Sequence, residues 1–227
     1  TVDNPFFYSY NTTRHYKTVN IEPNRNITLD ISFDFNIDPC TAVIGQYDRV
    51  NFKFVVFDVI TANPQTMQGK SPLESVCAMI QRKYISSGIF TRDKIRVTGD
   101  ASGKNGTADN VVNRSFYTTI KRELSLYDSQ VVLRAMNTPH QFSGEVINYF
   151  LRYCDFYHNN NQLDNDITIA FNDGKDTLNE AKKKHGLHIL DAWRYLVDYW
   201  ICNLGGYTND YSRIRGAIDL NIKKYIG

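Results

Sequence analysis

The stretch that most constrains the fold is Ile27–Asp48, in which two strand-like runs flank a tight connection. Apolar residues alternate with polar ones in the first run, and the second run contains the block A-V-I. The connecting letters are N-I-D-P, and Asn, Asp and Pro each favour turns. We therefore predict a β-hairpin here, with Asp38 as a turn residue rather than a metal ligand.

Asp34 lies near the end of the first predicted strand, between Phe33 and Phe35. A carboxylate among large apolar residues is costly to bury unless it is paired, hydrogen-bonded or bound to a cation. The local sequence is equally compatible with a side chain that faces solvent or caps the turn. Other acids later in the chain must decide between these interpretations.

Length and composition indicate an ordinary globular protein. The 227 residues suffice for one large domain or two small ones, and 42% are hydrophobic and 22% charged. A net charge of +2 gives no strong overall attraction to nucleic acid, although a local basic patch is compatible with it. The four cysteines are far apart and form no C-x-x-C pair, so we predict reduced core residues of a cytosolic protein. The given sequence shows no signal-peptide pattern, no apolar run of membrane-spanning length and no G-x-x-x-x-G-K-[ST] loop.

Periodicity and capping signals predict the remaining elements. Further strands are expected at Asn51–Thr61, Lys94–Gly99, Gln130–Arg134 and Asp166–Phe171. Helices are expected after the capping box at Ser71–Glu74, and at Thr107–Leu124, His140–Cys154, Thr177–Lys184 and Leu187–Leu204. Residues 1–26 show no clear period and are predicted to be an extended lead-in. This order predicts an α/β fold whose mixed sheet starts with three antiparallel strands, continues with parallel strands and has helices on its faces.

Three aspartates are candidates for a site at one edge of this sheet. Asp34 and Asp100 end two predicted strands, and Asp191 lies near the start of the last helix. Three carboxylates that meet would repel one another unless a divalent cation neutralised them, and Mg²⁺ and Mn²⁺ prefer such oxygen ligands. Two such ions about 4 Å apart can activate a water and stabilise the leaving oxygen of a phosphodiester. Spacing alone does not select these three, because the chain has 24 acids.

Three motifs in this sequence resemble those of one protein family. H-I-L-D-A-W-R-Y, at His188–Tyr195, resembles the H-x-x-D-A-x-R-Y signature that closes the nuclease domain of the large terminase subunit of tailed bacteriophages. S-F-D-F-N-I-D-P around Asp34 resembles the first acidic motif of that family, and V-T-G-D-A-S-G-K at Val97–Lys104 resembles the second. The three motifs occur in the family's order over residues 27 to about 204.

The resemblance implies a ribonuclease H-like nuclease domain over residues 27–227, with residues 1–26 linking it to an N-terminal ATPase domain. It implies a metal-dependent endonuclease that cuts concatemeric double-stranded phage DNA during packaging, with low sequence specificity. Asp34, Asp100 and Asp191 would bind Mg²⁺ or Mn²⁺, with two ions expected, and His188 would orient or deprotonate a water. The expected partners are DNA, the ATPase domain, the portal or procapsid and the small terminase subunit, in the cytoplasm of the host bacterium and with no membrane.

Two alternatives to this function remain open. The same fold could be a non-catalytic module that docks to the portal, procapsid or small terminase subunit, or another ribonuclease H-like nuclease such as a resolvase or transposase; the D-A-W-R-Y ending disfavours the latter.

Several residues keep a structural interpretation beside a functional one. The resemblance makes Glu74 a candidate for a fourth acid of the metal site, while its place in the capping box gives it an equally well supported structural role. Lys104, His185 and the run Lys182–Lys184 could contact DNA phosphates or form a solvated face. Arg194 is expected to pair within the fold, Asp109 to cap a helix, and Trp193 and Trp200 to lie in the core. His140 and His158 are interpreted as ordinary polar residues.

Overall fold

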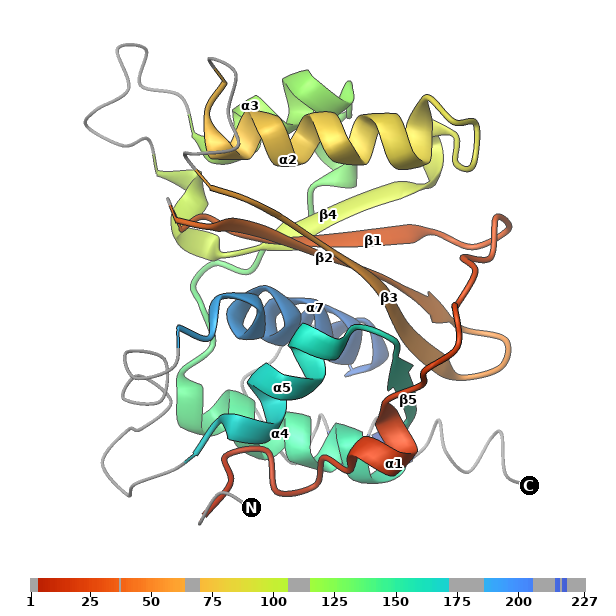
Figure 1. The fold of residues 1–227 in the computed structure, drawn as a ribbon, viewed down its shortest axis with the longest axis vertical. Helices are drawn as coiled ribbons and strands as arrows, with labels where there is room; N and C mark the ends of the chain where they lie inside the picture. Colours follow the sequence, from red (N-terminus) through yellow and green to blue (C-terminus); the bar gives the residue numbers. More distant parts are fainter. Residues whose placement is uncertain are drawn as a thin grey trace.

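A computed structural model describes residues 4–36, 38–63, 70–105, 115–171, 186–205, 215–216 and 218–219. The described part of the chain forms three layers, with a β-sheet between two layers of helices (Figure 1). The predicted helix at Thr177–Lys184, together with Asp109, His185 and the run Lys182–Lys184, lies outside the described residues.

The central layer is a mixed five-stranded sheet in the order β4-β1-β2-β3-β5. Its strands are β1 Leu29–Asp34, β2 Cys40–Asp48, β3 Lys53–Ala62, β4 Ile95–Gly99 and β5 Asp155–His158. Strands β1, β2 and β3 pair antiparallel in chain order. Strand β4 pairs in parallel with β1, and β5 pairs in parallel with β3. The predicted hairpin and mixed sheet are therefore confirmed, and Asp38 lies in the turn.

Helices cover both faces of the sheet, as predicted. The α-helices are α1 Thr12–His15, α2 Pro72–Ile80, α3 Phe116–Leu124, α4 His140–Tyr153, α5 Asn161–Ile169 and α7 His188–Gly205. A π-helical turn, Gln81–Ile85, continues α2, and short 3₁₀ turns occupy Arg92–Lys94, Ala101–Lys104 and Asp128–Gln130. Figure 1 shows α2 and α3 on one side of the sheet, and α7, α4 and α5 on the other.

The alternation of β1 separates its apolar side chains from its acids. Leu29, Ile31 and Phe33 are fully buried in the core against α2 and α3. Because successive side chains of a strand point to opposite faces, Asp30, Ser32 and Asp34 face α7. The Trp200 indole confirms this orientation, since its Nε1 donates to Asp30 Oδ2 at 2.8 Å. The second core, on the α7 side, contains the predicted core residues Trp193 and Trp200, both with no exposed surface.

The strand predicted at Asp166–Phe171 is wrong, because residues 166–169 form the last part of helix α5. Asn160 caps this helix, and its side chain accepts from Leu163 N at 2.8 Å. Leu163 and Ile167 are both buried, and their spacing of four is that of a helix face. The strand of this region is β5, which precedes the helix and which the sequence interpretation missed.

The strand predicted at Gln130–Arg134 is also wrong. A single parallel bridge joins Val131 to Val97 beside β4, and Val132 N donates to Val97 O at 2.8 Å. Gln130 ends a 3₁₀ turn, and its side chain donates to Arg92 O and Ile95 O at 2.5 and 3.0 Å. Three residues after this bridge, Arg134 pairs with an acid on α7.

Residues 4–17 pack onto the domain rather than running past it. Phe6 and Phe7 are buried in the core on the α7 side, and the Phe7 ring meets Trp193 edge-on at 5.2 Å between centroids. His15 in α1 has no exposed surface, and its Nε2 lies 3.1 Å from Leu151 O. Part of the segment predicted as an extended lead-in therefore packs into the core.

No described helix combines the length and the apolar character needed to cross a lipid bilayer. All four cysteines are buried and free, as the sequence predicted.

Candidate active site

Two of the predicted acids lie side by side at the ends of adjacent strands. In the parallel pairing of β1 with β4, Phe33 is opposite Gly99, so the next residues, Asp34 and Asp100, are neighbours. The hydrogen bond from Asp100 N to Phe33 O, at 3.0 Å, continues the ladder to this point. Such strand ends are where open α/β sheets place their ligands.

Gly99 makes this close approach possible. Its φ of +140° belongs to the region that side chains disfavour, and a Cβ at this position would lie 2.3 Å from Phe33 O. Any other residue would therefore push the end of β4 away from β1. The glycine before Asp100 is part of the structure of the site and not an incidental part of the motif.

Hydrogen bonds from three side chains hold the two carboxylates. Asn36 Nδ2 donates to Asp34 Oδ2 at 2.5 Å. Asp100 Oδ1 accepts from Ser102 N at 2.8 Å and from Asn137 Nδ2 at 2.6 Å, and its Oδ2 accepts from Ser102 Oγ at 2.6 Å. Asp34 is buried, with 6% of its surface exposed, so these donors partly replace lost water.

Asp191 lies in the first turn of α7 and pairs with Arg194 from the same helix. Arg194 Nη1 lies 2.7 Å from Asp191 Oδ1, and only 1% of the arginine is exposed. The guanidinium also donates through Nε to Ser143 Oγ at 3.4 Å. The expectation that Arg194 pairs within the fold is confirmed, and this arginine partly neutralises the Asp191 carboxylate.

The pKa of Tyr195 reflects the charges of all three predicted acids. Burial raises the pKa of its hydroxyl most, and the charges of Asp191, Asp100 and Asp34 raise that pKa further. Tyr117 is affected similarly: burial raises its pKa, Asp100 and Asp34 add to the effect, and its hydroxyl donates to Asp100 O at 2.8 Å. The three acids therefore contribute negative potential to one region between the strand ends and α7.

His188 occupies the first position of α7, three residues before Asp191, and is half-buried. On a helix this spacing places the two side chains on one face. The neighbouring buried Asp166 supports the start of the helix by accepting from Ile189 N at 3.3 Å. Burial raises the pKa of Asp166 to about 6, against the opposing effect of that bond.

Glu74 forms the predicted capping box at the start of α2. Ser71 N donates to Glu74 Oε2 at 3.0 Å, and Glu74 N donates to Ser71 Oγ at 3.2 Å. Arg122 on α3 pairs with Glu74 Oε1 at 3.0 Å. The backbone bond from Ser71 is the largest influence that lowers the pKa of Glu74. These contacts occupy the carboxylate in a structural role.

The donor chemistry of the three aspartates fits a hard divalent cation, because carboxylate oxygens facing one region are the ligands Mg²⁺ and Mn²⁺ prefer. Within the described ranges, however, no three His, Cys, Asp or Glu side chains stand close enough together to hold one ion. The acids are instead held by Asn36, Ser102, Asn137 and Arg194. We therefore expect cation binding to require a side-chain rearrangement in at least one of them.

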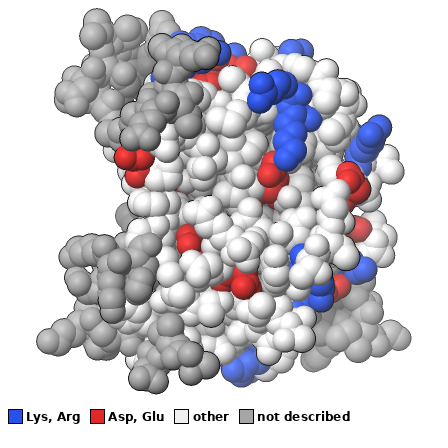
Figure 2. Space-filling model, in the orientation of Figure 1, with Lys and Arg blue, Asp and Glu red and all other residues white. Residues whose placement is uncertain are grey.

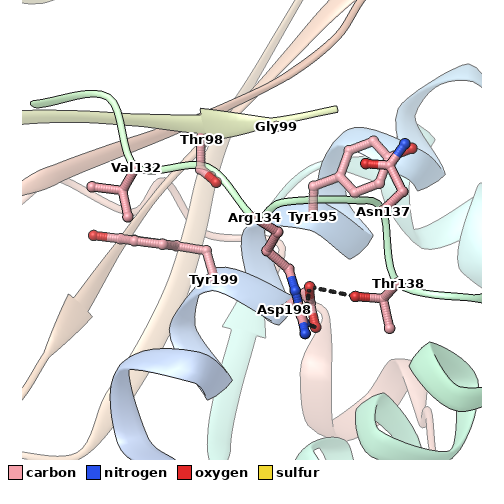
Figure 3. A pocket seen from close by; sticks show the side chains of 9 residues that line it. All are labelled: Thr98, Gly99, Val132, Arg134, Asn137, Thr138, Tyr195, Asp198 and Tyr199. Atoms are coloured by element: carbon pink, nitrogen blue, oxygen red, sulfur yellow. Dashed lines mark hydrogen bonds and ion pairs between the residues drawn. The ribbon is translucent and has the colours of Figure 1, made fainter. Parts of the chain in front are cut away.

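A small cavity of about 10 Å³, enough for about one water, borders this region. Its lining, shown in Figure 3, is Thr98, Gly99, Val132, Arg134, Asn137, Thr138, Tyr195, Asp198 and Tyr199. Arg134 and Thr138 both point toward Asp198 on α7, and Arg134 Nη1 lies 2.8 and 2.7 Å from its two carboxylate oxygens. The cavity thus lies between the end of β4 and α7.

The described surface on one face of the molecule carries mixed charge. On the face shown in Figure 2, basic and acidic side chains are interspersed across the described surface, and the basic ones form no continuous band there. Lys104, a candidate for phosphate contact, donates to Arg134 O. These observations agree with the net charge of +2.

The mixed sheet with helices on both faces is consistent with a ribonuclease H-like α/β fold. Solved structures of large terminases share this fold with the chain. The large terminase of a thermophilic bacteriophage, solved in complex with ATP-γ-S, superposes with a TM-score of 0.60 at 16% identity over 86% of this chain. The chain spans less than half of that terminase, 45% of which is covered.

Two isolated nuclease domains are also matched. The nuclease domain of the bacteriophage SPP1 large terminase, with bound Mn, gives a TM-score of 0.40 at 14% identity, over 76% of this chain and 84% of that one. The large terminase nuclease of thermophilic phage G20c gives 0.45 at 9% identity, over 74% and 81%. No protein-family model and no curated protein sequence matches the chain. The likeness to the ATP-γ-S-bound large terminase is one of fold, and it agrees with the family resemblance seen in the three motifs.

Sequence reasoning missed several residues that lie around the three predicted acids. Tyr195 follows Asp191 by four residues, and helical spacing could have placed it on the same face. Asn137 and the Arg134–Asp198 pair carried no such signal, because 37 residues separate Asn137 from Asp100 and 64 separate Arg134 from Asp198.

Proposed function

We propose that this chain is the nuclease domain of a phage large terminase, a metal-dependent endonuclease that hydrolyses double-stranded concatemeric DNA with little sequence preference. The observation that carries the proposal is the pairing of Asp34 and Asp100 at adjacent strand ends, on the face covered by the helix that bears Asp191. The fold shared with the ATP-γ-S-bound large terminase supports it. The ATPase domain, portal or procapsid and small terminase subunit are the proposed partners of the full-length protein, in the bacterial host.

In this proposal Asp34, Asp100 and Asp191 hold one or two Mg²⁺ or Mn²⁺ ions. When bound, the ions would supply charge neutralisation and lower the pKa of a bound water. Asn36, Ser102 and Asn137 keep the strand-end carboxylates oriented through their hydrogen bonds. Arg194 pairs with Asp191, and His188 would orient or deprotonate a water from the same helix face.

The mixed surface charge bears on how DNA is engaged. Affinity for duplex DNA comes largely from Lys and Arg contacts to phosphates. With basic and acidic groups interspersed on the described face in Figure 2, we propose that this domain alone binds DNA weakly and depends on the rest of the terminase to deliver it.

The test is nicking and linearisation of supercoiled plasmid by the chain in Mn²⁺, Mg²⁺ or EDTA. We expect cleavage that requires the metal and falls about 100-fold in Asp100→Asn, which corresponds to about 3 kcal/mol of transition-state stabilisation. Asp93→Asn is the matched control, because this exposed acid precedes β4 at the opposite end of the strand.

Equal cleavage by Asp100→Asn and wild type would refute the site assignment. Absence of cleavage together with absence of Mn²⁺ binding in calorimetry would favour the alternative of a docking module that binds the portal, procapsid or small subunit.

A further inference from the structure

Asn137 contacts the candidate site from a distant part of the sequence. Its side-chain amide makes two hydrogen bonds to consecutive residues: Nδ2 donates to Asp100 Oδ1 at 2.6 Å, and Oδ1 accepts from Ala101 N at 2.7 Å. The amide thus holds the carboxylate and the backbone just after it at the same time. This two-point contact fixes the direction of the carboxylate more strictly than one bond could.

The acceptor positions of Asp100 show what this contact leaves available. A carboxylate oxygen can accept about two hydrogen bonds. Ser102 N and Asn137 Nδ2 occupy both positions of Oδ1, whereas Oδ2 accepts from Ser102 Oγ among the described residues. A ligand approaching Asp100 would therefore meet the remaining acceptor position of Oδ2.

The segment that carries Asn137, residues 131–138, is anchored at both ends. Near its start, Val132 N donates to Val97 O of β4 at 2.8 Å. Toward its end, Thr138 Oγ1 donates to Asp198 Oδ2 at 2.8 Å, and between them Arg134 forms a two-oxygen pair with the same Asp198 (Figure 3). Asp198 is 6% exposed, so the pair and the hydroxyl satisfy an acid that would be costly to bury alone.

This segment forms a continuous link between two of the proposed metal-binding acids. Asn137 holds Asp100 at the end of β4, while Arg134 and Thr138 hold Asp198 on α7, the helix that carries Asp191 two turns earlier. The segment therefore sets how the end of β4 faces α7.

We propose that Asn137 is a positioning residue that presents Asp100 Oδ2 for coordination of a divalent cation by a single oxygen. The inference rests on the proposed function, because it assigns Asn137 a role in the metal site of that nuclease. Residues that orient a metal ligand through hydrogen bonds typically change metal affinity by about 10-fold to 100-fold when they are removed.

The test compares Mn²⁺ binding by the whole chain in calorimetry for wild type, Asn137→Ala and Asn51→Ala. Asn51 is the matched control, because it is also an exposed asparagine whose Nδ2 donates to an aspartate, Asp48, at 2.7 Å, in the β2–β3 turn. We expect about tenfold weaker Mn²⁺ binding in Asn137→Ala and wild-type affinity in Asn51→Ala. Thermal unfolding without metal should shift by similar amounts in both variants, because each loses surface hydrogen bonding.

Plasmid cleavage supplies a second readout. The cleavage rate of Asn137→Ala should recover toward that of wild type when the Mn²⁺ concentration is raised about tenfold. A variant that lost activity because it failed to fold would not recover in this way.

The outcomes separate the two proposals. Wild-type Mn²⁺ affinity in Asn137→Ala would overturn the role of Asn137 and leave the nuclease proposal standing. Lack of Mn²⁺ binding and of cleavage in the wild-type chain would overturn both.

Discussion

Asp30 shows at the residue scale how burial shapes an acid outside the candidate site. It lies on the same face of β1 as Asp34, four residues earlier, and lines a hollow of about 510 Å³ at the other end of the strand. Burial raises its pKa to about 7, although the hydrogen bond from Trp200 and the charges of Arg96 and Arg49 oppose the shift. A buried carboxylate with this pKa reduces stability near neutral pH.

The pH dependence of this effect follows from proton binding. In the unfolded chain Asp30 ionises near pH 4, while in the folded protein it does so at about pH 7. Between these values the unfolded chain releases a proton that the folded protein keeps, so the free energy of unfolding falls as the pH rises. Above pH 7 both states are ionised and the loss is constant.

We therefore predict that Asp30→Asn is more stable than wild type at pH 8, by on the order of 2 kcal/mol. The amide oxygen can still accept from Trp200 Nε1, so the native contact is kept. The gain should disappear toward pH 4, as measured by urea unfolding at each pH. Asp93→Asn, in the same hollow but exposed, is the control. A gain independent of pH would contradict the assignment to Asp30 ionisation.

At the scale of single elements, the start of α2 decides between two roles for Glu74. The capping box and the Arg122 pair account for both oxygens of this carboxylate. Backbone N–H groups at a helix start have no partner within the helix, so such a cap stabilises the helix directly. If Glu74 were instead a metal ligand, its removal would be expected to affect cation binding more than the stability of the fold.

For Glu74→Ala we predict a loss of about 1 kcal/mol in the free energy of unfolding, with Mn²⁺ affinity unchanged. Ser71→Ala, which removes the other half of the box, should give a similar loss. Urea unfolding and calorimetry measure the two quantities. A fall in Mn²⁺ affinity at unchanged stability would instead make Glu74 a fourth acid of the site.

Helix α7 belongs to both the core and the candidate site. One side packs Trp193, Val197 and Trp200 into the apolar core, and Asp191 and Asp198 carry the polar contacts. The buried tryptophans fix the position of α7 on the sheet, and this also fixes where the acids on α7 lie. The rigidity of the site therefore depends on the packing of this helix.

At the scale of the whole molecule, residues 4–17 complete the core on the α7 side. Phe7 is 2% exposed and contacts Trp193, which itself lies on α7. Hydrogen bonds from Arg14 to Arg152 O and Cys154 O, both at 3.0 Å, attach the same segment to the end of α4. The stability of the domain should thus depend on residues that precede its sheet.

We predict that Phe7→Ala lowers the free energy of unfolding by about 3 kcal/mol, because it leaves a cavity beside Trp193. Its neighbour Tyr8 is 60% exposed, so Tyr8→Ala should change stability by less than about 0.5 kcal/mol. Urea unfolding of the two variants makes the comparison. Equal effects would show that the segment does not contribute to the core as described.

Much of this protein follows from interactions between residues close in the sequence. Period-two alternation predicted β1, although it left the orientation of Asp34 open, and the Ser71–Glu74 signal predicted the start of α2. Local signals also existed where the interpretation failed, since the Asn160 cap and the spacing of Leu163 and Ile167 indicate the helix at α5. Ile167, Ile169 and Phe171 also recur at every second position, which matches the period of a strand and not that of the helix that forms.

Local and long-range interactions contribute differently to the candidate site. Periodicity and the motifs indicate which acids end strands β1 and β4 and begin α7, so these positions could be read from the chain without a structure. Tertiary packing decides three other contacts: Asn137 with Asp100, Arg134 with Asp198, and Phe7 with Trp193 in the core. Such contacts join residues that are far apart in the sequence, and the local sequence around one residue gives no indication of the other. These contacts are therefore fixed only when the layers pack together.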